Sequence, residues 1–187
     1  MWSSREIALV VVFAVLLVIF GLFIGRLAWM IQIPPFESST AYLLSIFYSI
    51  IHSLAFLMYK GKRWTLFSQA LISNLLNIVL GAPISGIPMA TVTNLFICDV
   101  IFNSFYGVFE QKKRLLWLTL SFQVFYWATH AIWLLVYNSI FFFSFEGLMK
   151  FWFIPIMLIL IPIMVIEGVI GGYTGYKIYG RVEKLIA

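Results

Sequence analysis

Charged residues and cysteines are scarce in this chain of 187 residues. Only 10% of the residues are Asp, Glu, Lys or Arg, whereas 63% are hydrophobic and 19% are aromatic. So few charged side chains cannot cover a water-soluble globule of this size, which excludes the soluble classes of protein. The single cysteine, Cys98, excludes an intrachain disulfide framework and every metal motif that needs two cysteines.

Catalytic and metal-binding motifs are also missing. The sequence has no Walker A loop, no G-x-S-x-G elbow, no H-E-x-x-H helix and no pair of carboxylates at catalytic spacing. His52 and His130 are the only histidines. Counting residues from the nearest basic clusters places them about 12 Å apart in depth, whereas two ligands of one haem would be nearly level. We therefore expect no metal, no other cofactor and no enzymatic activity.

What the sequence does contain is long apolar segments separated by basic clusters. Ten of its twelve Lys and Arg residues fall in four clusters: Arg5; Lys60, Lys62 and Arg63; Lys112, Lys113 and Arg114; Lys177, Arg181 and Lys184. Each interval between clusters can hold two membrane-spanning helices of about 20 residues. Because Lys and Arg concentrate in cytoplasmic loops, an even number of crossings between clusters places all four inside. Charge at span ends, rather than along one face, argues against a nucleic-acid partner.

The pattern predicts an all-α membrane protein with six transmembrane helices in one bundle and with both termini in the cytoplasm. The expected spans cover residues 6–31, 40–59, 64–82, 88–109, 115–137 and 151–179, within a single integral membrane domain, 1–187. The first apolar run is longer than a signal-peptide core and no A-x-A cleavage site follows it, so we expect it to remain as a helix. The expected location is the cell membrane, with multiple passes through the lipid bilayer.

Polar residues within the spans mark the faces that are turned away from lipid. The helix at 40–59 has one polar stripe, made of Ser45, Tyr48, Ser49 and His52. The helix at 115–137 has the richest stripe, with Gln123, Tyr126, His130, Trp133 and Tyr137 at helical spacing, and Asn94 of the preceding helix is expected at a similar depth. An aromatic wall with a few polar groups is what a small-molecule pocket requires. We therefore predict that Asn94, Tyr126, His130 and Trp133 bind a substrate in the outer half of the bundle, under a lid formed by Trp29 and Gln32. Interhelical hydrogen bonding and interface anchoring would explain the same residues without a ligand.

Asp99 is expected near the middle of the membrane, where an ionised carboxylate costs at least about 2.5 to 3.5 kcal/mol to insert. One hypothesis assigns it to the substrate site, as the floor of the pocket or as the partner of a cationic ligand. The other treats it as a structural carboxyl that bonds to Asn103 on its own helix, or to the helix at 64–82.

Four glycines in the last span have the spacing of a helix-packing motif. Gly168 with Gly172, and Gly171 with Gly175, are GxxxG pairs, which allow another helix to approach closely. The partner helix belongs either to this chain or to a separate subunit.

The six-helix outline, the Arg-Glu-Ile-Ala start at residue 5 and the ending Glu-Gly-Val-Ile-Gly-Gly-Tyr-Thr-Gly-Tyr-Lys-Ile-Tyr-Gly-Arg at 167–181 resemble the substrate-binding S component of energy-coupling factor (ECF) transporters. The resemblance implies vitamin uptake or the capture of a similar small molecule at the extracellular half of the fourth to sixth helices. It also implies docking onto a membrane coupling subunit that cytoplasmic ATPases power in trans. The chain has no ATPase motif of its own.

Two other classes of protein fit the same pattern. An accessory structural subunit of a larger membrane complex, with no ligand of its own, would explain a first span with almost no polar residue before Arg26. A stand-alone channel or carrier is the third class. A ligand-sized cavity in the outer half would favour the S component, whereas aromatic side chains filling that volume would favour the accessory subunit.

Overall fold

A computed structural model describes residues 2–31, 45–81, 86–141 and 147–186, without the side chains of 25–29, 31, 86–88, 135, 138–141, 147–157 and 185–186. Within these ranges the regular structure is entirely helical, which confirms the predicted all-α class. The six helices are α1 (Ser4–Ile31), α2 (Ser45–Met58), α3 (Thr65–Val79), α4 (Gly86–Gln111), α5 (Leu115–Phe141) and α6 (Gly147–Ile186). Residues 40–44 and 82, which the prediction placed in the second and third spans, lie outside the described residues.

Within the described residues, three helices are long and apolar enough to cross a membrane. Their apolar segments are Ser4–Ile24, Met89–Gln111 and Leu158–Lys184. α3 is apolar but has only 15 residues, or about 23 Å at 1.5 Å per residue, against a hydrocarbon core about 30 Å thick. α2 is also apolar, and 14 of its residues, from the edge of the described range at Ser45, are described. The three longer segments are compatible with a membrane protein, whereas six crossings remain a prediction.

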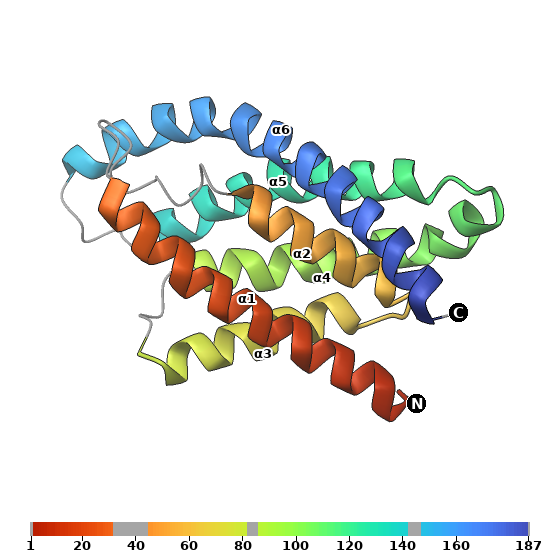
Figure 1. Ribbon diagram of the computed structural model, residues 1–187. Helices are drawn as coiled ribbons and strands as arrows, with labels where there is room; N and C mark the ends of the chain where they lie inside the picture. Colours follow the sequence, from red (N-terminus) through yellow and green to blue (C-terminus); the bar gives the residue numbers. More distant parts are fainter. Residues whose placement is uncertain (1, 32–44, 82–85, 142–146, 187) are drawn as a thin grey trace.

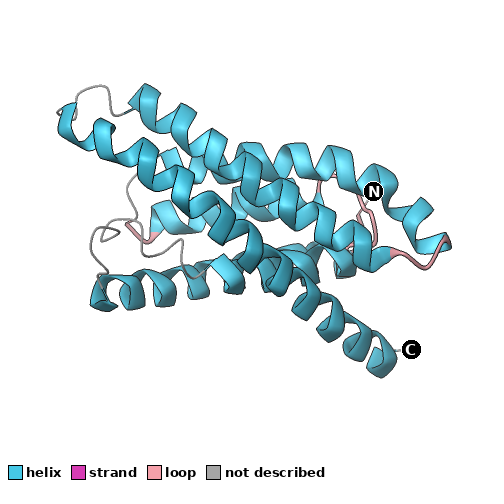
Figure 2. Ribbon diagram, turned by 90° about the horizontal axis from the view of Figure 1, so that it is seen from above, coloured by secondary structure: helices cyan, strands magenta, loops and turns pink. Residues whose placement is uncertain are grey.

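The helices pack against one another in a closed ring (Figures 1 and 2). α1 packs against α3, α3 against α4, α4 against α5, α5 against α6 and α6 against α2, which returns to α1. The interface between α2 and α6 is the most extensive, and α2 also contacts α5 across the inside of the ring. The polar stripes of α2 and α5 are therefore brought together inside the bundle.

Both chain termini lie at the same end of the bundle as the α2–α3 and α4–α5 turns (Figure 1). Two ion pairs join the α2–α3 turn to the terminal helices: Lys62 Nζ lies 3.2 Å from Glu6 Oε1, and Lys60 Nζ lies 3.5 Å from Glu183 Oε1. Exposed pairs of this kind contribute little stability. They do show that the basic α2–α3 turn lies beside the basic ends of α1 and α6, as an even number of helix passes between these clusters requires.

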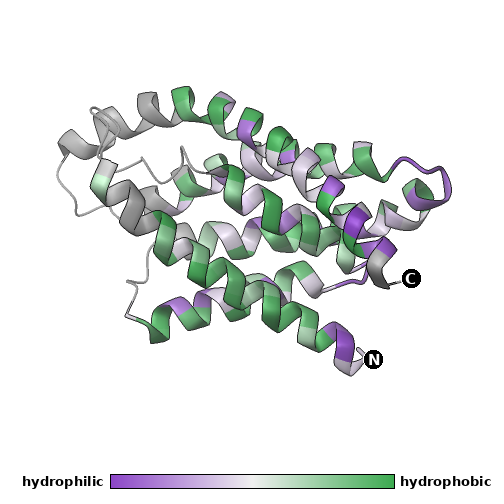
Figure 3. Ribbon diagram, in the orientation of Figure 1, coloured by the Kyte–Doolittle hydropathy of each residue, from purple (hydrophilic) through white to green (hydrophobic). Residues whose placement is uncertain are grey.

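α1 has an apolar face that no other described helix covers. Its large exposed hydrophobic residues, among those described, are Ile7, Val11, Val12, Val15, Ile19, Leu22, Phe23 and Met30. Figure 3 shows hydrophobic residues along most of the helical surface and hydrophilic ones concentrated near the termini and the basic turns. Such a large exposed apolar surface is typical of contact with lipid or with another membrane subunit.

Candidate functional site

A group of buried polar and aromatic side chains lies where α2, α5 and α6 meet, and we call it the central cluster. Its members are Ser45, Ser49, His52 and Ser53 of α2, Gln123, Tyr126, Trp127 and His130 of α5, and Glu167 of α6. Every member from α2 and α5 is at most 4% exposed. In an apolar bundle, so much buried polarity must be matched by internal hydrogen bonds.

Glycines of α6 allow α2 to approach closely enough to form this cluster. A Cβ atom at Gly171 would lie 2.5 Å from Cβ of Ser49, and one at Gly175 would lie 2.8 Å from Cβ of Ser53. Real Cβ atoms essentially never come so close, so only glycine fits at these two positions.

The other two glycines of the GxxxG pairs face α5. A Cβ atom at Gly168 would lie 2.5 Å from Cδ1 of Trp127, and one at Gly172 would lie 3.0 Å from Cγ of Gln123. The two GxxxG pairs therefore overlap along α6 but contact different helices: Gly171 and Gly175 contact α2, and Gly168 and Gly172 contact α5. Both contacted helices belong to the same chain.

Hydrogen bonds join α2 and α5 at the level of these glycines. Gln123 Nε2 donates to the Ser53 hydroxyl at 2.7 Å and to the Ser49 carbonyl at 3.2 Å. The Trp127 indole N–H donates to Ser49 Oγ at 2.7 Å, and that hydroxyl donates to the Ser45 carbonyl at 2.9 Å. The network accounts for most of the polar atoms in this part of the cluster.

The two histidines flank one tyrosine in the rest of the cluster. The ring centroids of His52 and Tyr126 are 5.0 Å apart, and the His130 ring stacks on Tyr126 at 5.4 Å with an interplanar angle of 17°. The Nδ1 atom of each histidine is buried and has no hydrogen-bond partner among the described residues. Leaving such a buried polar atom unsatisfied costs about 1 to 3 kcal/mol, so a bound group that satisfies it would be stabilised.

The predicted difference of about 12 Å in depth between His52 and His130 is wrong, because both rings contact Tyr126. The estimate assumed that the basic clusters lie at one level. Figure 1 shows instead that the α4–α5 turn projects beyond the α2–α3 turn, so that α5 starts further out than α2 ends. His130 consequently lies closer to the level of His52 than residue counting indicates.

The remaining residues of the predicted substrate site occupy different surroundings. Asn94 is buried and links α4 to α5, since its Nδ2 donates to the Tyr126 carbonyl at 2.7 Å and its Oδ1 accepts from the Thr129 hydroxyl at 2.6 Å. Trp133 is partly buried and stacks on Tyr137 at 5.9 Å. Gln32 and the side chain of Trp29 lie outside the described residues. The structure thus brings Tyr126, His130 and Asn94 close together, with both ends of the Asn94 amide already bonded.

Asp99 accepts three hydrogen bonds at the start of α3. Its Oδ1 accepts from the Trp64 backbone N–H at 2.7 Å and from Asn103 Nδ2 at 2.9 Å, and its Oδ2 accepts from the Phe67 N–H at 3.1 Å. Helix N-termini favour negative charge and leave several N–H groups free. Of the two hypotheses, this geometry is that of the structural carboxyl, bonded both to Asn103 and to α3.

Glu167 accepts hydrogen bonds from the first described residues of α2. Its Oε2 accepts from the Ser45 hydroxyl at 2.6 Å and from the Ile46 backbone N–H at 3.1 Å. Each of the two short helices therefore begins at a carboxylate that a longer helix supplies.

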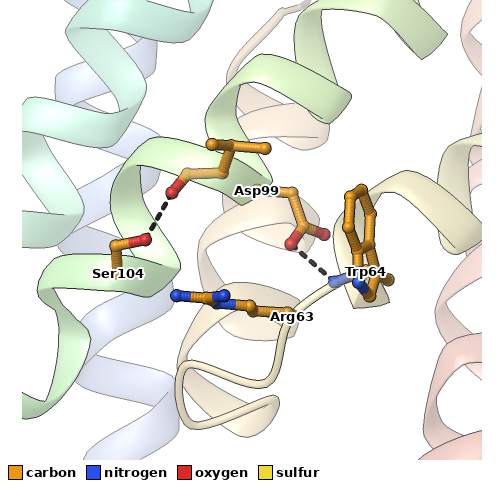
Figure 4. A pocket seen from close by; sticks show the side chains of 5 residues that line it. Arg63, Trp64, Asp99 and Ser104 are labelled. Atoms are coloured by element: carbon orange, nitrogen blue, oxygen red, sulfur yellow. Dashed lines mark hydrogen bonds between the residues drawn. The ribbon is translucent and has the colours of Figure 1, made fainter.

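A shallow cavity of about 200 Å³ lies apart from the central cluster, between the α2–α3 turn and α4. Arg63, Trp64, Asp99, Val100 and Ser104 line it (Figure 4). The sequence did not predict this cavity. It also did not predict that His52, Gln123 and Trp127 belong to the central cluster. The signal for His52 and Gln123 was their position on the polar stripes of α2 and α5.

No three His, Cys, Asp or Glu side chains gather into a metal-binding group within the described part of the chain. Comparison with known protein families, with curated proteins and with solved structures finds no match to this chain.

Proposed function

We propose that the protein is a six-span membrane subunit that captures a small molecule at the outer edge of the central cluster, as the S components that its sequence resembles do. The observation that carries this proposal is the pair of buried imidazoles around Tyr126, each with an Nδ1 atom that has no partner among the described residues. A ligand that is flat and carries hydrogen-bonding groups would stack on such rings and bond to the free nitrogen of His130.

The surroundings of the cluster suit selective binding. Hydrogen bonds and glycine contacts hold Trp127 and Gln123 against α2 and α6, so the ring positions are fixed before a ligand arrives. Fixed rings lose little conformational entropy on binding, which favours affinity. In this proposal α4 and α5 supply Asn94, Tyr126 and His130 to the site.

Import in this proposal needs partners, because the chain has no ATPase motif. A membrane coupling subunit and cytoplasmic ATPases would supply the energy in trans. Since the four glycines of the GxxxG pairs contact helices of the same chain, we assign the docking surface to the exposed apolar face of α1 instead.

The second candidate is an accessory structural subunit without a ligand. It is favoured by the aromatic packing inside the ring, where Phe122 stacks on Phe56 at 5.0 Å and contacts Phe102 at 5.6 Å. These rings occupy volume that a ligand could otherwise use. Identification of a bound molecule separates the two candidates.

The test is mass spectrometry of small molecules that remain bound to the purified chain. We expect one compound to co-purify with the wild type, and His52→Phe and His130→Phe to bind it about tenfold to a hundredfold more weakly in calorimetry, the equivalent of about 1 to 3 kcal/mol. Ser73→Ala is the matched control, because Ser73 is also buried and polar but lies in α3 and bonds only to the Ala70 carbonyl.

A wild-type chain that carries no small molecule would support the accessory subunit. Equal binding by both histidine variants would place the ligand away from the central cluster.

A further inference from the structure

The cavity at the α2–α3 turn has the chemistry of a site for a charged headgroup. Figure 4 shows the Arg63 side chain extending below Asp99 toward Ser104, with the Trp64 indole on the other side of Asp99. Arg63 and Ser104 are exposed, so the cavity opens at the surface of the bundle. Its volume of about 200 Å³ is sufficient for a phosphate group and part of a glycerol backbone.

Arg63 forms no ion pair with the acid beside it. Both oxygens of Asp99 are occupied by the N–H groups of Trp64, Phe67 and Asn103. The ion pairs among the described residues involve Lys60 and Lys62, not Arg63. A guanidinium at the mouth of a cavity, with no carboxylate partner in the described part of the chain, is suited to bind an anion through two parallel hydrogen bonds.

An apolar surface continues from the cavity along α4. Phe96, Val100 and Ser104 follow one another at intervals of four residues, and Phe96 and Val100 are 39% and 48% exposed. The Trp64 ring, itself 48% exposed, lies 5.8 Å from the Phe96 ring. Trp64 has a left-handed backbone with φ of 69°, which bulky residues rarely adopt, and its N–H bond to Asp99 fixes it there. The site therefore combines a cationic end with an apolar wall.

We propose that this cavity binds one anionic phospholipid from the leaflet on the side of the basic turns. The phosphate accepts hydrogen bonds from the Arg63 guanidinium, and an acyl chain lies along Phe96 and Val100 beside the Trp64 ring. Basic pockets between membrane helices on the cytoplasmic side recognise lipid headgroups in this way. A soluble phosphate would leave the apolar wall without a function, so a lipid fits the site better.

Native mass spectrometry of the purified full-length chain, titrated with dioleoyl phosphatidylglycerol or dioleoyl phosphatidylcholine, tests the proposal. We expect the first phosphatidylglycerol to bind about fivefold more tightly than phosphatidylcholine, the equivalent of about 1 kcal/mol for one basic residue at the surface. Arg63→Gln should abolish this preference, and Arg63→Lys should restore part of it. Arg114→Gln, which changes an exposed basic residue of the α4–α5 turn, should keep it. The melting temperature of Arg63→Gln should match that of the wild type, because Arg63 is exposed.

Three results would overturn the proposal. The first is an unchanged lipid preference in Arg63→Gln, and the second is an equal loss in Arg114→Gln, which would indicate diffuse attraction to the whole basic surface. The third is binding of glycerol phosphate as tight as that of the lipid, which would assign the cavity to a soluble anion.

Discussion

At the scale of single residues, two acids explain how short helices can begin inside an apolar bundle. The N-cap residue of α3 is Trp64, whose side chain makes no capping hydrogen bond. Asp99, 35 positions later, supplies the missing acceptor, and Glu167 supplies one to the Ile46 backbone N–H across 121 positions. A buried N–H group without an acceptor costs about 1 to 3 kcal/mol. The two carboxylates therefore stabilise the first turns of α2 and α3, whether or not a ligand binds nearby.

Replacing Asp99 with alanine should destabilise the protein through α3. The Trp64 and Phe67 N–H groups would lose their acceptor, and we expect the free energy of unfolding in a detergent titration to fall by about 2 to 4 kcal/mol. Hydrogen exchange should also accelerate over residues 64–67. Ser104→Ala is the control, since Ser104 is exposed and bonds only to the Val100 carbonyl of its own helix. Its effect should stay within about 0.5 kcal/mol. Unchanged stability and exchange in Asp99→Ala would show that α3 does not need this cap.

Of these contacts, those of Asp99 could be predicted from the sequence and those of Glu167 could not. The sequence allowed a structural Asp99 bonded to Asn103 or to the following helix, because both partners were within reach on the expected spans. The bond from Glu167 to the start of α2 could not be predicted. It depends on α2 and α6 being neighbours, and nothing in one sequence reports the order of helices around a ring.

At the scale of helices, the spacing of small residues predicted close packing but not its partners. Gly171 and Gly175 contact α2, where Ser49 and Ser53 are the matching small residues at the same interval. Gly168 contacts α5 instead. The polar stripes on α2 and α5 were likewise visible in the sequence as buried faces. Their contact with each other, and hence the contact of His52 with Tyr126, arises from the relative depth of the two helices.

Two alanine substitutions in α6 measure the contribution of this packing. Gly171→Ala would place a Cβ atom 2.7 Å from the Ile46 backbone oxygen, so α2 must move, and we expect a loss of about 1 to 3 kcal/mol in unfolding free energy. At Gly180 an added Cβ atom meets nothing within 4 Å. Gly180→Ala should therefore be neutral or stabilising by up to about 1 kcal/mol, because alanine is the better helix former. Equal effects of the two substitutions would mean that helix propensity, not the α2–α6 contact, governs both.

At the scale of the whole molecule, charge and hydropathy predicted the arrangement better than they predicted the lengths of the elements. The six helices, and the two termini at the end that holds the basic turns, follow from the four Lys and Arg clusters. The expected span 64–82 starts within one residue of α3 (Thr65–Val79) but runs past its end, since Leu80 and Gly81 already form a turn. Residues 40–44 of the expected span 40–59 lie outside the described residues. Hydropathy reports which residues can lie in lipid, but it does not report where a helix ends.

The central claim is that the ring of six helices crosses the membrane six times, with the basic turns inside. The short α3 tests it most stringently. On a Cys98→Ser background, single cysteines at Lys62 and Leu80 would mark the two ends of α3, and one at Lys113 would mark the α4–α5 turn. Cysteines at Ser85 and Glu146, which lie outside the described residues, are predicted to be external.

The decisive measurement is labelling of these cysteines in intact cells with a membrane-impermeant maleimide. The account predicts that the cysteine at Leu80 reacts from outside, whereas those at Lys62 and Lys113 react only after the membrane is permeabilised. Reaction of the cysteines at Lys62 and Leu80 from the same side would contradict it, because α3 would then not cross the membrane.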